Sequence, residues 1–318
     1  MQLLNRRHVL LGGTFEGLAL AGCVGPAAAR AGQPVTLAPG VYMVPGSGGA
    51  ADESNLGRIG NAGFIVGEAG VIAVDTGTSY AHGQALLNTI RTVTHLPVRQ
   101  ALVTHTRPEF LFGGPAFRDS GIPIHMHSRT ARLMASRCES CLKTLRQTLG
   151  DAAMQGTAVY KADQEFEGAH TLDSIGRLVK VLYFGHSSGP GDIAVLDVAS
   201  GVLFAGGLLD VQRIPDIQDS DPAGWAKALR ELRALAPRTV VGGHGPASPA
   251  PAAIGGVERY LAQLDQRVRA LLAQGTSLLD VPEATELPEF ARWDQYDIIH
   301  RRNASIAFLR SERELMFK

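Results

Sequence analysis

The sequence has few aromatic residues and no excess of charge of either sign. Phe, Trp and Tyr make up 6% of the 318 residues, and 30 Lys and Arg balance 30 Asp and Glu. A neutral chain without basic runs lacks the electrostatic footprint that attracts nucleic acid or an anionic membrane surface. Few aromatic rings also leave little surface on which bases could stack. We therefore expect no nucleic-acid partner.

The sequence also lacks internal repeats, which argues against a solenoid. Apolar residues nevertheless make up 45% of the chain and charged residues 19%, a composition typical of a globular protein with a sizeable core. The length is compatible with one large domain or two ordinary ones.

The first 31 residues resemble an export signal. Arg6 and Arg7 precede an apolar run at 9–21, which is too short to form a stable membrane-spanning helix. The paired arginines resemble a twin-arginine signal, which directs folded proteins out of the cytoplasm. We therefore predict that residues 1–31 are an export signal and that the protein is periplasmic.

Residues 20–23 resemble a lipobox, in which Cys23 would become the lipidated first residue of the mature protein. Cleavage after Ala31, in a small-x-small sequence, is the alternative. A lipid anchor at Cys23 is the only membrane attachment that we expect. We further predict a linker at 32–39 and a single folded domain at 40–318, because Ala, Gly and Pro dominate the sequence before residue 40.

Short apolar strands alternate with amphipathic helices throughout the predicted domain. Strands at 62–67 and 70–75 are followed by a helix at 79–93 and a strand at 100–104. The alternation then continues through helices at 129–149, 225–235, 254–272 and 296–317 and strands at 178–183, 193–197, 201–205 and 239–243. This order fits two mixed sheets packed face to face with helices outside both.

Polar motifs follow several of these strands. They contain Asp75 in 74–77, His105 in 104–114, His186 in 185–192 and His244 in 241–246. A single histidine after a strand is usually a hydrogen-bonded loop residue. Together, in this order and spacing, the motifs resemble the metallo-β-lactamase superfamily over nearly the whole mature chain. The resemblance implies an α+β fold, the αββα sandwich of two mixed β-sheets with helices on both outer faces.

The resemblance also implies a metal site, but four positions depart from the family pattern. In the family, histidines and carboxylates hold two metal ions that activate a hydroxide. Here Arg107, Glu109, Phe110 and Gly207 stand where the family has His, Asp, His and a bridging Asp. Arg107 stays protonated and so cannot bind a metal, and Phe110 and Gly207 have no side-chain lone pair to donate. Asp210 has an odd offset from Gly207, so on a strand it would face the other way.

Two interpretations of the site remain. In the first, His105, Glu109, His186 and His244 hold one metal ion, such as zinc, and the protein is a hydrolase of esters, thioesters or lactones. In the second, no metal binds, and the protein is catalytically degenerate. Arg107 then supplies the positive charge, pairs with Glu109 and binds an anionic ligand.

In both interpretations the partner is a small molecule, and a dinuclear zinc site is not expected. The family pattern gives Asp75, and by analogy Asp192, a supporting role as hydrogen-bond partners of the motif that carries a histidine.

Cys138 and Cys141 form a Cys-x-x-Cys pair within a predicted helix. Residues three apart on a helix are about 5–6 Å apart, which suits a disulfide, and export would place the pair in an oxidising compartment. We predict a structural disulfide. A pair of free thiols and a redox role are the alternatives.

His127 ends a predicted strand at 122–127, directly before the helix at 129–149. A structural role is expected for it, and it could cap that helix.

One branch of the superfamily is the most similar. The stretches 54–66, 75–80, 138–142 and 300–303 resemble the quinoprotein relay system zinc metallohydrolases. Those are exported proteins found alongside dehydrogenases that use pyrroloquinoline quinone. The resemblance implies a periplasmic accessory role in such a system and names no reaction.

Overall fold

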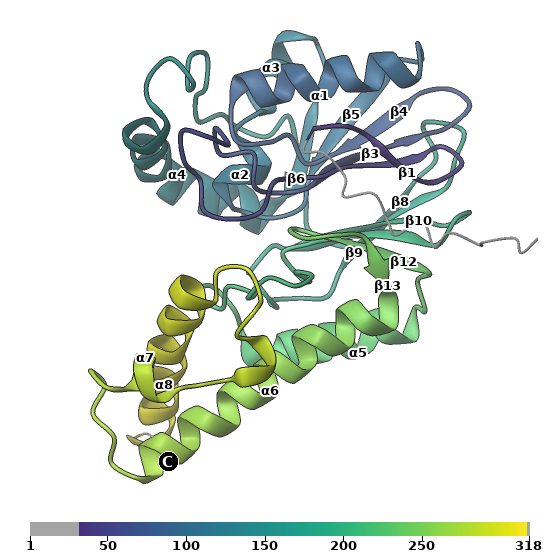
Figure 1. Ribbon diagram of the computed structural model, residues 1–318. Helices are drawn as coiled ribbons and strands as arrows, with labels where there is room; N and C mark the ends of the chain where they lie inside the picture. The colour runs from purple at the N-terminus through teal and green to yellow at the C-terminus, as the bar shows by residue number, and fades with distance from the viewer. Residues whose placement is uncertain (1–31, 317–318) are drawn as a thin grey trace, which may run out of the picture.

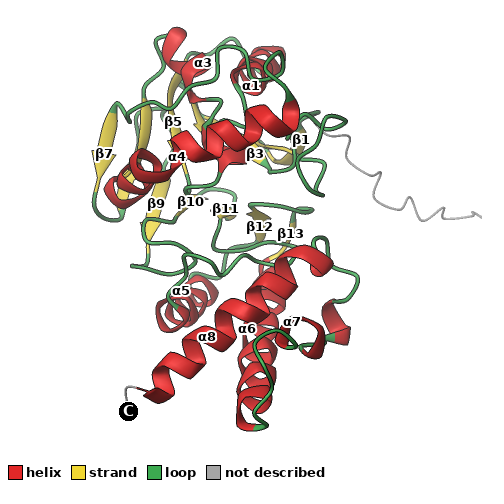
Figure 2. Cartoon of the chain, turned by 90° about the vertical axis from the view of Figure 1, so that its left-hand side faces the viewer, coloured by secondary structure: helices red, strands yellow, loops and turns green. Residues whose placement is uncertain are grey.

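Four layers make up the protein (Figure 1). The computed structural model describes residues 32–316. Helices α1 (Tyr80–Val93), α3 (Gly114–Asp119) and α4 (Ser128–Leu149) cover the outer face of a seven-stranded sheet. Helices α5 (Pro222–Ala234), α6 (Ala250–Ala273) and α8 (Arg301–Met316) cover the outer face of a six-stranded sheet (Figure 2). The predicted αββα sandwich is confirmed.

The seven-stranded sheet keeps its strands in chain order. They are β1 (Val35–Ala38), β2 (Val41–Val44), β3 (Ala62–Val66), β4 (Val71–Val74), β5 (Val98–Val103), β6 (Ile124–His127) and β7 (Gln164–Phe166). The first four pair antiparallel, and β4 to β7 pair parallel. The short α2 (Pro108–Leu111) follows β5 and carries Glu109 toward the second sheet.

The six-stranded sheet reverses the chain order. Its strands run β13 (Ser248–Pro249), β12 (Thr239–Gly242), β11 (Val202–Gly206), β10 (Ile193–Asp197), β9 (Val179–Tyr183) and β8 (His170–Leu172). Only β11 and β12 pair parallel. The C-terminal part also contains α7 (Val281–Ala284), a 3-10 turn at Pro288–Phe290 and a π-helical turn at Tyr296–His300.

Side-chain alternation along the strands divides the core into layers. Ile65, Ile72 and Leu102 pack in the apolar cluster between the two sheets. Their neighbours Phe64 and Ala73 pack in the apolar cluster between the seven-stranded sheet and helices α1, α3 and α4. Successive strand residues point to opposite faces, so strands buried on both sides become continuous apolar runs. This explains why these strands could be predicted from the sequence.

The predicted linker at 32–39 is wrong. It contains β1, which pairs with β2 through Val35 opposite Met43 at the edge of the first sheet. The strand is short and half-exposed, so its apolar alternation is weak, and composition alone suggested a linker. The predicted export signal and Cys23 lie outside the described residues. Within residues 32–316, no helix is both long and apolar enough to span a bilayer.

Side chains cap the main helices. Ser79 accepts a hydrogen bond from the backbone N–H of His82 at the start of α1. His127 Nδ1 accepts one from the N–H of Arg129 at 3.1 Å at the start of α4, so the cap predicted for His127 is confirmed. Such caps satisfy the backbone donors that a helix leaves unpaired at its N-terminus.

Asn61 joins the two sheets next to the start of β3. Its side-chain amide donates to the carbonyl oxygens of Gly242 at 3.0 Å and Gly245 at 2.8 Å. Its Oδ1 accepts from the N–H of Gly46, and its own N–H donates to Gly243. The side chain is 4% exposed. One buried amide therefore fixes the loop after β12, which carries His244.

Replacing Asn61 by leucine should lower the free energy of unfolding by about 1–3 kcal/mol, because it leaves buried backbone groups unpaired. Urea unfolding measures the change. Asn88→Leu is the matched control, since Asn88 is exposed and bonds only to Arg91. Equal stability of the two variants would contradict a clamping role for Asn61.

Candidate functional site

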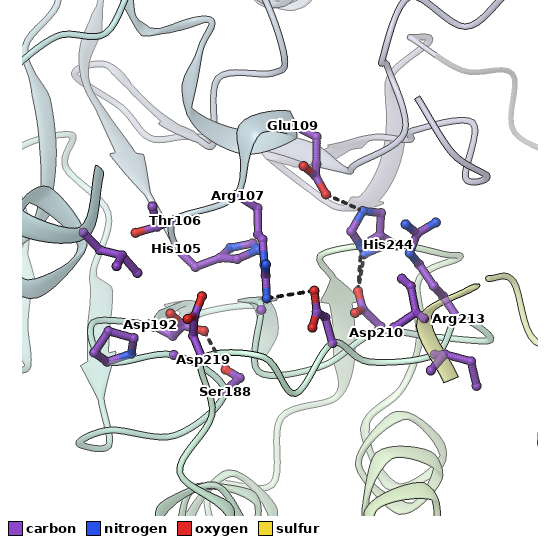
Figure 3. Close-up of a pocket in the computed structure, with 17 residues that line it drawn as sticks. His105, Thr106, Arg107, Glu109, Ser188, Asp192, Asp210, Arg213, Asp219 and His244 are labelled. Carbon is purple, nitrogen blue, oxygen red and sulfur yellow. Dashed lines mark hydrogen bonds and ion pairs between the residues drawn. The ribbon is translucent and has the colours of Figure 1, made fainter. Parts of the chain in front are cut away.

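A polar cavity of about 70 Å³ lies where the loops after β5, β9, β11 and β12 meet (Figure 3). Four residues predicted from the motifs line it, namely His105, Arg107, Glu109 and His244. The predicted supporting residue Asp192 lines it as well. Segments far apart in the sequence therefore converge here, as the motif order predicted.

His244 is held between two carboxylates. Its Nδ1 lies 2.8 Å from Oδ1 of Asp210, which also accepts the His244 backbone N–H at 2.9 Å. Its Nε2 lies 3.2 Å from Oε1 of Glu109. Asp210 therefore faces the site, contrary to the expectation from its offset. It follows β11, where the chain has left the strand and the alternation of faces no longer applies.

This Asp210–His244–Glu109 bridge is charged. Burial opposes the cationic form of His244, but Asp210 and Glu109 outweigh it and raise the pKa of the imidazole. Burial likewise opposes the anionic form of Glu109, yet the adjacent His244 imidazole, together with Arg107, lowers its pKa to about 2. A protonated His244 offsets one of its two carboxylate neighbours and leaves the unit with one net negative charge.

Arg107 pairs with Asp216 and not, as predicted, with Glu109. Its Nη2 lies 3.0 Å from Oδ2 of Asp216, and the same oxygen accepts from Arg302 at 2.6 Å. Glu109 is already engaged by His244. Within residues 32–316, Nε and Nη1 of Arg107 make no hydrogen bond. The guanidinium therefore retains donors that a ligand can use.

His105 is buried and neutral. Its Nδ1 lies 2.8 Å from the Thr104 hydroxyl, which lies 2.9 Å from both oxygens of Asp75. Burial and the charge of Arg107 lower the pKa of His105 to about 3. Asp75 thus contacts the segment that carries the first histidine, which is the position expected for it. With Thr104 donating to Asp75, Nε2 of His105 keeps its lone pair.

Phe110 fills the space between the two histidines of the cavity. Its ring centroid is 4.3 Å from that of His105 and 5.2 Å from that of His244, and the side chain is fully buried. An apolar ring therefore stands where the family places a metal-binding histidine.

Asp192 takes the space that a bridging aspartate would need. A Cβ atom at Gly207 would lie 2.8 Å from Oδ2 of Asp192 and 2.8 Å from Cδ2 of His105, closer than real contacts allow. The Asp192 carboxylate accepts a hydrogen bond from Ser188 at 2.6 Å. Burial raises its pKa to about 6. Asp192 therefore belongs to the cavity wall itself, whereas the sequence suggested only a supporting role.

His186 does not join the other predicted residues. The side chain is exposed, and Nε2 lies 2.7 Å from the backbone carbonyl oxygen of Asp219. It is not part of the cavity wall. The predicted set of four metal ligands is therefore not brought together, because a carbonyl from the loop before α5 holds this ring outside.

The donor set does not fit zinc, the metal that the resemblance implies. Among residues 32–316, no group of three or more His, Cys, Asp or Glu side chains is arranged to hold a metal ion. Both ring nitrogens of His244 face carboxylates, and the Arg107 and Phe110 side chains offer no lone pair. Buried cationic groups occupy a region where a metal site would gather anionic and neutral donors.

The acidic loop between β11 and α5 contributes site residues that the motifs did not predict. Asp216 and Asp219 line the cavity from this loop, together with Arg213. Arg213 is paired with Asp294 at 2.5 Å, and Asp219 with Arg137 at 2.6 Å. The available signal was the concentration of aspartates in a short stretch, at Asp210, Asp216, Asp219 and Asp221.

Cys138 and Cys141 are free thiols, so the predicted disulfide is wrong. On a helix both side chains lean toward the N-terminus, and their Cβ atoms do not turn toward one another as a disulfide requires. Cys138 packs in the core beneath α4. The neighbouring Cys138 lowers the pKa of the Cys141 thiol.

Asp192→Asn should change how stability depends on pH. The pKa of Asp192 is about 6 in the folded protein, above the ordinary value of 3.8 for an aspartate side chain. The stability it contributes is therefore present below about pH 4 and lost as pH rises through about 6. The unfolding free energy of Asp192→Asn, relative to that of the wild type, should therefore rise by about 2–3 kcal/mol between about pH 4 and pH 8. Urea unfolding across this range measures it. A difference independent of pH would contradict burial of an ionisable carboxyl.

Comparison with known proteins agrees with the layered fold. The family model described as "Metallo-beta-lactamase superfamily" matches residues 56–244. A metallo-beta-lactamase from Pontibacter korlensis shares 18% identity with a TM-score of 0.58, over 72% of this chain and 98% of that chain. A metallo beta lactamase from Hirschia baltica shares 19% identity with a TM-score of 0.57, over 72% of this chain and 96% of that chain.

Identities this low show a common fold and do not transfer an activity. The match to the family model, however, spans more than half of the 318 residues. This chain belongs to the metallo-beta-lactamase superfamily.

Proposed function

We propose that this protein is a metal-independent member of the superfamily that binds a small carboxylate ligand in the polar cavity. The observation that carries the proposal is the replacement of metal-binding side chains by Arg107 and Phe110, with His244 held in the Asp210–His244–Glu109 bridge. The charges of the site are balanced by partners within the chain, so its residues favour binding over hydrolysis.

The free donors of Arg107 define the ligand class. A guanidinium donates charge-assisted N–H bonds to carboxylates, and Nε and Nη1 of Arg107, which lie on different edges of the group, each remain as a single donor for such a ligand. Asp192, with a pKa of about 6, is partly protonated near neutral pH and can then donate a hydrogen bond. A cavity of about 70 Å³ holds a few atoms only. Acetate-sized carboxylates therefore fit, and nearby carboxylates keep the affinity weak.

The mononuclear hydrolase that the sequence left open is less well supported. It requires His186 to leave the carbonyl of Asp219 and enter the cavity. It also requires His244 to release Glu109 or Asp210. We find no observation that favours these movements.

The cellular context of the proposal rests on sequence resemblance. The export-signal pattern supports a periplasmic location, and similarity to quinoprotein relay system proteins supports an accessory role beside a quinoprotein dehydrogenase. A small carboxylate is a plausible ligand there because oxidation of alcohols and aldehydes ends in carboxylates.

Sodium acetate should raise the melting temperature of the full chain above that in sodium chloride at equal ionic strength, since a ligand that binds only the folded state stabilises it. Arg107→Gln should abolish this difference. Arg118→Gln, which breaks a surface pair with Asp163 away from the cavity, should retain it. Differential scanning calorimetry measures the shift. Acetate without effect on the wild type, or with an equal effect on Arg107→Gln, would refute the proposal.

A further inference from the structure

A second, larger cavity lies between α5, α6 and α8. Figures 1 and 2 show these three helices on the outer side of the six-stranded sheet. Its volume is about 350 Å³, within the range of small-molecule sites. Apolar side chains from all three helices and the loop before α5 line it, including Ile217, Trp225, Leu229, Leu261, Leu264 and Ala307. Neither the polar cavity nor its proposed ligand involves this region.

The carboxylates at the rim of this apolar cavity already have arginine partners. Asp265 and Glu314 both pair with Arg269, at 2.9 Å and 3.1 Å. Glu258 pairs with Arg233. These pairs leave no unpaired anion among the described residues that line the cavity.

Two arginines of the same rim lack such partners. Arg310 donates from Nη1 to the Ser220 hydroxyl at 3.1 Å and from Nη2 to the carbonyl oxygens of Ile217 and Gln218, each at 3.0 Å. Within residues 32–316, neither Arg310 nor Arg230 forms a salt bridge. Arg310 is half-buried, so its charge is poorly solvated. With Arg233 counted beside its partner Glu258, four arginines face three carboxylates at this rim, which leaves one net positive charge beside the apolar cavity.

We propose that this cavity binds a single-chain amphiphile with a carboxylate head, a medium-chain alkyl carboxylate. The alkyl chain covers the apolar walls around Trp225, Leu229 and Leu264, which removes apolar surface from water. The head lies at Arg310 and Arg230 and supplies the missing anion.

A second copy of the chain fits this cavity less well. Stable interfaces between proteins bury more than about 1,000 Å² and carry few charges at their centre. Here charged side chains from α5, α6 and α8 ring a narrow hollow, which suits a slender ligand whose head meets the ring.

Isothermal titration of the full chain with sodium octanoate, below its micelle-forming concentration, tests the proposal. We expect one octanoate per chain and a negative heat-capacity change, the mark of buried apolar surface. The uncharged 1-octanol should bind about tenfold more weakly or worse, because it leaves the guanidinium groups unpaired.

Variants locate the site. Ala307→Phe fills the cavity from α8 and should abolish octanoate binding, whereas acetate stabilisation at the polar cavity should persist. Arg310→Met should remove the preference for octanoate over octanol, and Arg230→Gln tests the same point if Arg310→Met fails to fold. Lys227→Gln is the matched control on α5, since Lys227 pairs with Glu231 and neither residue lines the cavity.

Three results would overturn the proposal. They are absence of octanoate binding to the wild type, unchanged binding to Ala307→Phe, and octanol binding as tight as that of octanoate. A dimer that Ala307→Phe dissociates, in protein that binds no octanoate, would assign the surface to a second copy instead.

Discussion

Buried charges need partners, and the polar cavity supplies them from within the chain. A buried imidazolium or guanidinium left alone is too costly to persist, and here His244 and Arg107 each have an opposite charge at contact distance. His244 lies between Asp210 and Glu109, and Arg107 faces Asp216. Phe110 separates His244 from the neutral His105. The cationic side chains of the site are thus paired within the chain. The hydrogen-bond donors left for a ligand are the unused N–H groups of Arg107 and the carboxyl of Asp192, whose pKa is raised.

The helices after residue 244, where the match to the family model ends, help to build this arrangement. Asn303 of α8 donates to the carbonyl of Pro215 at 2.7 Å and accepts from the N–H of Ile217. Arg302 of the same helix shares Asp216 with Arg107. Helix α8 therefore holds the acidic loop in place from outside the sandwich. The same helix forms one wall of the apolar cavity, so both cavities depend on its docking.

Most of the strands and helices, and about half of the residues that line the polar cavity, could be predicted from the sequence. Alternating apolar runs predicted the main strands because both faces of each strand are buried, whereas β1 was missed at a half-exposed edge. Residues next to strand ends converged as the motifs required. The direction of a side chain was not predictable from local sequence. The ring of His186 is held outside the cavity by the carbonyl oxygen of Asp219, about thirty residues later in the chain. The partner of Arg107 lies more than a hundred residues away, and no local pattern identifies it.

In the function that we propose, internal ion pairs take the place of bound metal. Elemental analysis tests this on the full chain, produced with zinc in the medium, purified without chelator and passed through gel filtration. We expect far less than one transition-metal ion per chain. One or two ions retained per chain would contradict it, since such binding requires His244 and its carboxylates to abandon the contacts described above.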